Sequence, residues 1–233
     1  MNRLIRGKLV AVKPNDTWAS VSDKTGVTQP DTLRAVLRFV QQYEPRELIV
    51  TGGAVAAETD EVFRIADLMD VVTQEEATFF DHNRPFVSVD LPYAPEHDVR
   101  GPQRSVMVNP RVLDYETVIA VNQLKLHDTA TVTLALKNIA MSFPAADYYG
   151  HPRSTQRHKN AFFADMHSFI AAMGKRFPIH LAITVGHPAM ISTGPLGGHA
   201  VETGLVIAST DALVADVVGA RLLGFDPQAV RHL

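Results

Sequence analysis

Cysteine is absent from this chain of 233 residues. The absence excludes structural disulfides, a thiol nucleophile and any iron–sulfur cluster held by thiolates of this chain. Runs of about 18 apolar residues, long enough to span a bilayer, are missing too, so we expect no membrane partner. The formal net charge is only −3, which argues against a nucleic-acid partner. A cytoplasmic location is therefore the default expectation.

Hydrophobic residues make up 46% of the chain and charged residues 20%, which is ordinary for a globular protein. A chain of this length buries a sizeable core without disulfides or metal ions. Its length also suits one large α/β domain. We therefore expect residues 1–233 to form a single domain.

Segments with strand and helix patterns alternate along the chain. We predict strands at 8–13, 48–51, 117–121, 181–185 and 205–209, and helices at 30–43, from Thr59 onward, 131–141, 159–176 and 210–223. This alternation favours βαβ units, hence a mainly parallel sheet with flanking helices. The segments 86–91 and 105–108 predict a short antiparallel excursion, and 186–198 predicts a glycine-rich loop.

Unusual polar residues follow several of these strands. Lys13 and Asn15 end the first strand, while Lys125 and His127 follow the strand at 117–121. Ligands of parallel sheets bind beyond the carboxyl ends of the strands, so we expect a site there. If 122–127 is extended, Lys125 and His127 share one face, where they could serve as an anion-binding cation and a general acid or base. The alternative is a solvated lysine and a hydrogen-bonded loop histidine.

Lys137 interrupts the almost wholly apolar segment 131–141. A buried lysine needs a partner or becomes partly neutral, and both outcomes suit catalysis. The alternative is a side chain that extends to the surface along its aliphatic stem. Thr129 or Thr131 is the expected helix cap, and Asn138 is a candidate ligand-binding residue.

Two loops complete the basic and glycine-rich part of the sequence. Arg153, Arg157 and His158 belong to a basic loop, where a solvated surface and an anion site are both open interpretations. Gly194 and Gly197 would let backbone N–H groups approach an anion, although a long turn is the simpler interpretation.

Two aspartates mark the last predicted helix. Asp211 lies in its first turn, where the helix dipole favours a carboxylate. Asp216 lies among alanine and valine, so we expect it to be buried against Lys137 or Lys125 as a structural or tuning partner. Both aspartates are candidate ligand-binding residues.

Several motifs occur in an order that resembles the family known as domain of unknown function 362. They are LVAVKPN (9–15), TGG with TDEVF (51–63), LKLHDTATVTLALKNIA (124–140), STGPLGG (192–198) and LVIASTDALVADVVGARLLGFDP (205–227). His158 is similar to the histidine that follows the third motif in this family. The resemblance covers nearly the whole chain.

The resemblance implies no settled activity and no known cofactor. Some members carry a ferredoxin-like cysteine segment, which this chain lacks, and members often have an aspartate where Val185 stands. We expect further residues after 224–227 in a full-length member. The association with ferredoxin modules suggests redox metabolism by analogy alone.

Three hypotheses follow. The first is a small-molecule enzyme or ligand-binding domain for an anionic carboxylate or phosphate, with catalysis by Lys125, His127, Lys137 and His158. The second is a non-catalytic subunit that docks a ferredoxin-type protein. The third is a metal-dependent enzyme using His127, His158 and Asp216, although no histidine spacing matches a strong metal motif.

Overall fold

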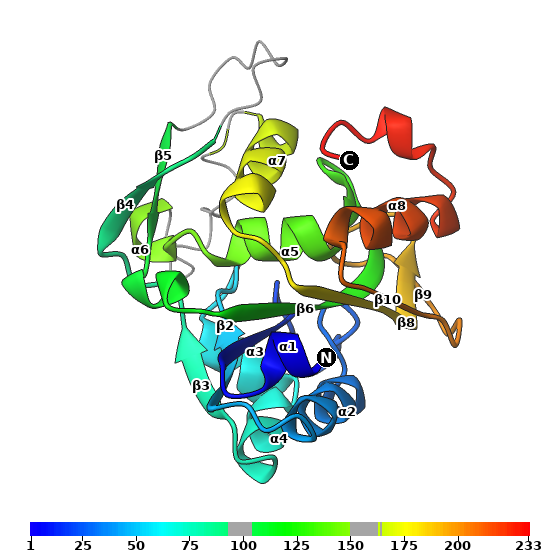
Figure 1. Ribbon diagram of the computed structural model, residues 1–233. Coiled ribbons are helices and arrows are strands. Elements are labelled where there is room, and N and C mark those ends of the chain that lie inside the picture. The colour runs from blue at the N-terminus through cyan, green and yellow to red at the C-terminus, as the bar shows by residue number, and fades with distance from the viewer. Residues whose placement is uncertain (93–103, 150–162, 164) are drawn as a thin grey trace.

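The computed structural model describes residues 1–92, 104–149, 163 and 165–233 (Figure 1). Its strands are β1 (Leu9–Pro14), β2 (Glu47–Gly52), β3 (Thr78–Asp81), β4 (Val87–Asp90), β5 (Ser105–Val108), β6 (Thr117–His127), β7 (Thr131–Thr133), β8 (Leu181–Ile191), β9 (His199–Val201) and β10 (Val206–Ser209). Its α-helices are α1 (Asn2–Ile5), α2 (Pro30–Gln41), α3 (Thr59–Ile65), α4 (Leu68–Gln74), α5 (Ala135–Ser142), α6 (Ala146–Tyr149), α7 (Met166–Arg176) and α8 (Ala212–Leu222). Short 3₁₀ helices are η1 (Pro110–Leu113) and η3 (Pro227–Ala229).

The central sheet has the strand order β10-β8-β6-β1-β2-β3. Its pairings from β3 through β2, β1 and β6 to β8 are parallel, and β10 is antiparallel to β8. The strands β4 and β5 form a separate antiparallel pair. The prediction of a mainly parallel α/β fold with a short antiparallel excursion is therefore confirmed.

Helices cover both faces of the central sheet (Figure 1). The helices α5, α7 and α8 lie on one face, and α2, α3 and α4 lie on the other. Each face has its own buried apolar cluster, around Phe143 and Phe169 on the first and around Leu37 and Phe63 on the second. In α2 the predicted stripe of Leu33, Val36, Leu37 and Val40 is the buried side of the helix.

The prediction of a helix over 131–141 is wrong at its start. Residues Thr131–Thr133 form β7, which pairs antiparallel with the end of β6, and α5 begins only at Ala135. Thr131 has φ +66, a left-handed conformation that a helix excludes. Neither Thr129 nor Thr131 caps α5, because its N-cap is Leu134. All three residues of this segment are β-branched and favour a strand, and here they form the second strand of a hairpin with β6.

The glycine-rich loop is shorter than predicted. The strand β8 continues to Ile191, because the antiparallel strand β9 pairs with residues 189–191. Only 192–198 connects the two strands.

Two helix predictions also change. Thr59 is the first residue of α3 rather than its cap, and Asp67 at φ +60 separates α3 from α4. Of the helix predicted at 159–176, the structure has α7 from Met166. Residues 159–162 and 164 lie outside the described residues.

Candidate functional site

A pocket opens at the carboxyl edge of the central sheet, where the loops after β1 and β2 meet β6 and α5. This edge pocket has a volume of about 240 Å³. It is lined by Thr17, Val55, Ala56, His127, Asp128, Thr129, Lys137, Gly194, Pro195 and Leu196. The expected location of a site, beyond the ends of parallel strands, is therefore where this pocket lies.

A small polar cavity adjoins the edge pocket, and we call it the recess. Its volume is about 10 Å³, near the space that one water molecule occupies. It is lined by Asn15, Asp16, Thr17, Gly53, Val55, Thr133, Lys137, Asn138, Met141 and Ser142. Thr17, Val55 and Lys137 line both cavities, so these residues stand at the boundary between them.

Lys137 is a buried lysine with only 5% of its surface exposed, which excludes the surface interpretation. Burial lowers the pKa of its amine to about 7. No residue in the described part of the chain gives this amine a hydrogen bond or an ion pair. Asp216, the partner proposed from the sequence, accepts hydrogen bonds from backbone groups instead.

Lys125 is fully buried, so the interpretation as a solvated lysine is wrong. Its Nζ donates to the carbonyl of Gly26 over 2.6 Å. Burial, and then the nearby charge of Lys137, lower the pKa of Lys125 to about 7. Lys125 lines neither cavity, so it acts on the site through its charge.

His127 ends β6 in the extended conformation predicted for 122–127. Its Nδ1 accepts the N–H groups of Thr129 and Ala130, each over 3.1 Å, which leaves the proton on Nε2. Burial, and then Lys137 and Lys125, lower the pKa of His127 to about 2. The imidazole is thus neutral at physiological pH with its proton on Nε2, and His127 lines the edge pocket, which suits a hydrogen-bond donor better than a general base.

Asn138 links the ends of β1 and β6 in a buried network. Its Oδ1 accepts from Asn15 Nδ2 over 3.3 Å and from Lys13 Nζ over 3.4 Å, and its Nδ2 donates to Asn122 Oδ1 over 2.8 Å. Lys13 is fully buried and pairs with Asp16 over 2.5 Å. Burial lowers the pKa of Lys13, and Asp16 opposes that effect. The structure therefore brings Lys13, Asn15 and Asn138 together in one network.

The recess exposes polar atoms that lack partners. Within the described residues, Asn15 Oδ1 and Thr133 Oγ1 are buried and make no hydrogen bond. Both residues line the recess, as does Lys137. Unsatisfied buried polar atoms are costly, so a water molecule or a ligand group is expected to meet them here.

The two aspartates of the last helix have structural roles. Asp216 is buried, and its two oxygens accept the N–H groups of Ala135 and Leu136, each over 2.9 Å, at the start of α5. Burial raises the pKa of Asp216 to about 7. Asp211 is exposed and caps α8 by accepting from Val214 N over 3.1 Å. Neither lines a cavity described above, so their ligand-binding role stays a prediction.

The two predicted glycines differ. Gly194 lines the edge pocket, but its N–H already donates to Asp128 Oδ1 over 3.2 Å. A Cβ at Gly194 would lie 2.1 Å from the carbonyl oxygen of Leu126, so only glycine fits this approach. Gly197 has φ +69 and does not line the pocket. The N–H group of Gly194 is therefore already occupied, and Gly197 lies outside the lining of the pocket.

Some site residues were missed from the sequence. Asp16, Thr133 and Ser142 line the recess, and none was singled out beforehand. Asp16 directly follows Asn15 at the end of β1, a position that could have marked it. His158 lies outside the described residues. In the part of the chain that the structure describes, no three His, Cys, Asp or Glu residues are grouped to hold a metal ion.

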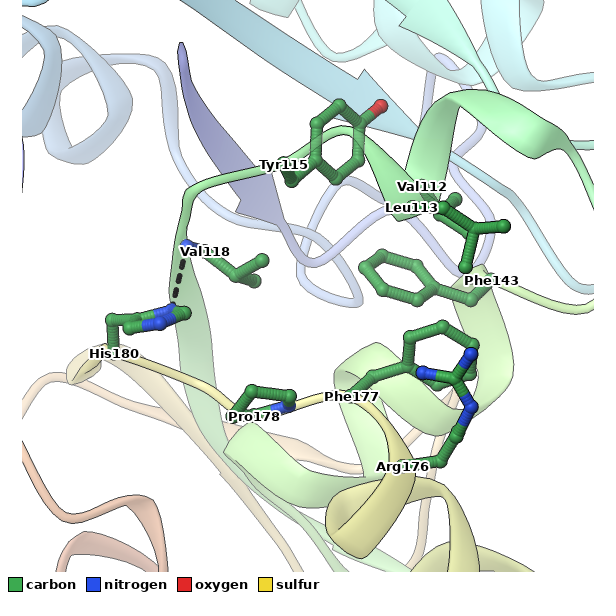
Figure 2. A pocket seen from close by; sticks show the side chains of 9 residues that line it. All are labelled: Val112, Leu113, Tyr115, Val118, Phe143, Arg176, Phe177, Pro178 and His180. Atoms are coloured by element: carbon green, nitrogen blue, oxygen red, sulfur yellow. Dashed lines mark hydrogen bonds between the residues drawn. The ribbon is translucent and has the colours of Figure 1, made fainter. Parts of the chain in front are cut away.

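A second pocket of about 340 Å³ lies at the opposite, amino edge of the sheet (Figure 2). Figure 2 shows apolar side chains and the rings of Phe143 and Phe177 turned toward one another, with Arg176 beside them. The guanidinium of Arg176 stacks 4.9 Å from the centre of the Phe177 ring, and His180 Nδ1 accepts from Val118 N. Because these polar groups already have contacts, we favour the edge pocket as the candidate site.

The chain is similar in sequence to a curated protein and similar in fold to a solved structure. A thylakoid-associated protein of Synechocystis sp. is 24% identical over 229 residues, covering 96% of this chain and 65% of that protein. The lactate racemase apoprotein from Thermoanaerobacterium thermosaccharolyticum matches with a TM-score of 0.52 and 12% identity, covering 95% of this chain and 50% of that chain. At such low identity the structural match shows the fold alone.

Within the described residues, no helix has the length and apolar character needed to cross a membrane. The family model described as a domain of unknown function, DUF362, matches residues 10–221, so this chain belongs to that family.

Proposed function

We propose that the edge pocket binds a small organic anion and that the protein is an enzyme acting on it. The single observation that carries this proposal is Lys137, a buried amine that faces a cavity without a counterion among the described residues. A bound carboxylate or phosphate would supply that counterion, which a buried cation needs. The attraction between the Lys137 ammonium group and the anion is stronger here than in water, because the effective dielectric constant inside a protein is lower.

The neighbouring groups fit such a ligand. His127 is neutral and offers Nε2–H as a hydrogen-bond donor, so it binds an oxygen atom without repelling Lys137. Asn15 and Thr133 leave polar atoms without partners in the recess, and these suit a hydroxyl or a water molecule. The protein of similar fold is a lactate racemase, so small carboxylates are the first ligands to try.

The test is a ligand titration of the whole chain followed by NMR, with acetate, lactate, pyruvate and inorganic phosphate as probes. We expect at least one probe to shift the amide resonances around the edge pocket. Lys137→Met should weaken that probe at least about tenfold, because it removes a buried charge partner. Lys175→Met, at an exposed position on α7, is the matched control and should bind as the wild type does. Unchanged affinity in Lys137→Met would refute the proposal.

A further inference from the structure

The backbone around Lys137 is held in place on two sides. Asp216 accepts the N–H groups of the two residues before it, Ala135 and Leu136. The next residue, Asn138, is fixed by hydrogen bonds to Asn122 and Asn15. A reactive side chain works best when its neighbours are already locked, and Lys137 has this support.

Of the buried lysines in the described residues, Lys137 alone faces a cavity with an unpaired amine. Lys13 is paired with Asp16, and Lys125 donates to a backbone carbonyl. Burial lowers the pKa of Lys137 to about 7 and so favours the uncharged amine, which is the form that attacks carbonyl carbon.

We propose, building on the anion site described above, that Lys137 forms an imine with the carbonyl carbon of a small 2-oxo acid. The lone pair of Lys137 Nζ forms a bond to the carbonyl carbon, and the carbonyl π bond breaks toward oxygen. Nε2–H of His127 donates a hydrogen bond to that oxygen as negative charge develops on it. One proton of the amine and one proton from solvent reach the oxygen, and the carbon–oxygen bond breaks to release one water molecule. The nitrogen lone pair forms the second carbon–nitrogen bond, which gives a protonated imine.

The chemical class of the substrate follows from charge. A protonated imine on Lys137 is a buried cation, and the described residues offer it no carboxylate partner. A 2-oxo acid carries its own carboxylate on the carbon next to the reacting one, so the cation and its counterion arrive together. The edge pocket of about 240 Å³ suits a short molecule of this kind.

The experiment is reductive trapping. The whole chain is incubated with pyruvate and sodium cyanoborohydride, and its mass is measured intact and after digestion to peptides. We expect one stoichiometric adduct, equal to pyruvate plus two hydrogens minus one water, and we expect it on Lys137. Acetate, which has no ketone, should give no adduct, and Lys137→Met should lose the adduct while Lys175→Met keeps it.

The outcomes separate this inference from the proposed function. Pyruvate that binds in the NMR titration but leaves Lys137 unmodified would overturn the imine and leave the anion site standing. Modification confined to other lysines would overturn it equally. Absence of the adduct together with absence of binding by all four probes of the NMR titration would refute both proposals. Peptide mapping of the wild-type chain identifies the lysine directly, so the test stands even if Lys137→Met fails to fold.

Discussion

The buried lysines illustrate how much the environment of a single residue decides. In the described residues Lys13, Lys125 and Lys137 are all buried, yet one has a carboxylate, one a backbone carbonyl and one a cavity. Burial lowers the pKa of each, because the charged form loses its water. Of these three lysines, only Lys137 has an amine that is available to a ligand.

Lys125→Met should stabilise the protein. The pKa of Lys125 falls from 10.5 to about 7 on folding, so the unfolded chain binds more protons between these values. The wild type therefore loses stability as pH falls from 10.5 to 7, and the variant does not. We expect the variant to gain about 1–3 kcal/mol in the free energy of unfolding at pH 7.

Urea denaturation at several pH values measures this difference. It should shrink as the pH rises from 7 toward 10, whereas a gain that stays constant with pH would contradict the explanation. Lys175→Met, at an exposed position, should change the free energy of unfolding by no more than about 0.5 kcal/mol.

The imidazole of His127 should not titrate between pH 5 and pH 8, because its pKa is lowered to about 2. Nitrogen-15 NMR of the ring should show the proton on Nε2 across this range. His187 is an internal control, since hydrogen bonds to Glu202 and Asp31 raise its pKa. A His127 ring that becomes doubly protonated in this range would show that our assignment of a neutral donor is wrong.

At the scale of elements, α5 is positioned by a carboxylate on another helix. Asp216 of α8 closes the amino end of α5, which carries Lys137 and Asn138. The exposed Asp211 caps its own helix, α8, instead. The two aspartates lie five positions apart, yet Asp216 stabilises the start of another helix, α5, and Asp211 stabilises the start of its own helix, α8.

Asp216→Ala should cost about 2–4 kcal/mol in the free energy of unfolding, because two buried N–H groups lose their acceptor. The pKa of Asp216 rises from 3.8 to about 7 on folding, so its contribution is full at low pH and declines as pH rises through 7. The cost should therefore be larger at pH 5 than at pH 8.

Asp211→Ala is the matched control for this prediction. Loss of an exposed cap costs about 0.5–2 kcal/mol and should leave anion binding unchanged, whereas Asp216→Ala should weaken it. Denaturation and the NMR titration give the two readouts. Equal effects of the two variants on binding would argue against the positioning role of Asp216.

At the scale of the whole molecule, one sheet joins two apolar clusters. The strand β6 is central: its residues Val118 and Ala120 belong to the cluster on one face, and Ile119 and Val121 belong to the cluster on the other. We therefore propose that residues 1–233 unfold as one domain. Thermal unfolding followed by the fluorescence of Trp18, the single tryptophan, should coincide with unfolding followed by far-ultraviolet circular dichroism. Two separated transitions would refute a single domain.

The sequence by itself determined the class of fold, the family and three of the residues that line the edge pocket, His127, Lys137 and Gly194. Alternating strand and helix patterns are local, and they predicted β1, α2 and the parallel sheet because apolar periodicity reflects which face is buried. The polar residues at strand ends pointed to Lys13, Asn15 and His127, because parallel strands bring their ends to one edge. Lys137 stood out for another reason, as a charged residue in an apolar segment.

Only the tertiary structure decided what each of these residues does. Whether 131–133 is helix or strand depended on pairing with β6, and the length of β8 depended on β9. The partners of Asp216 depended on contacts far apart in the chain, as did the position of Lys137 beside a cavity and the roles of Asp16 and Thr133 in the recess. Burial and hydrogen bonding are properties of the packed chain, and they set the charge of a lysine or a histidine that the sequence can only name.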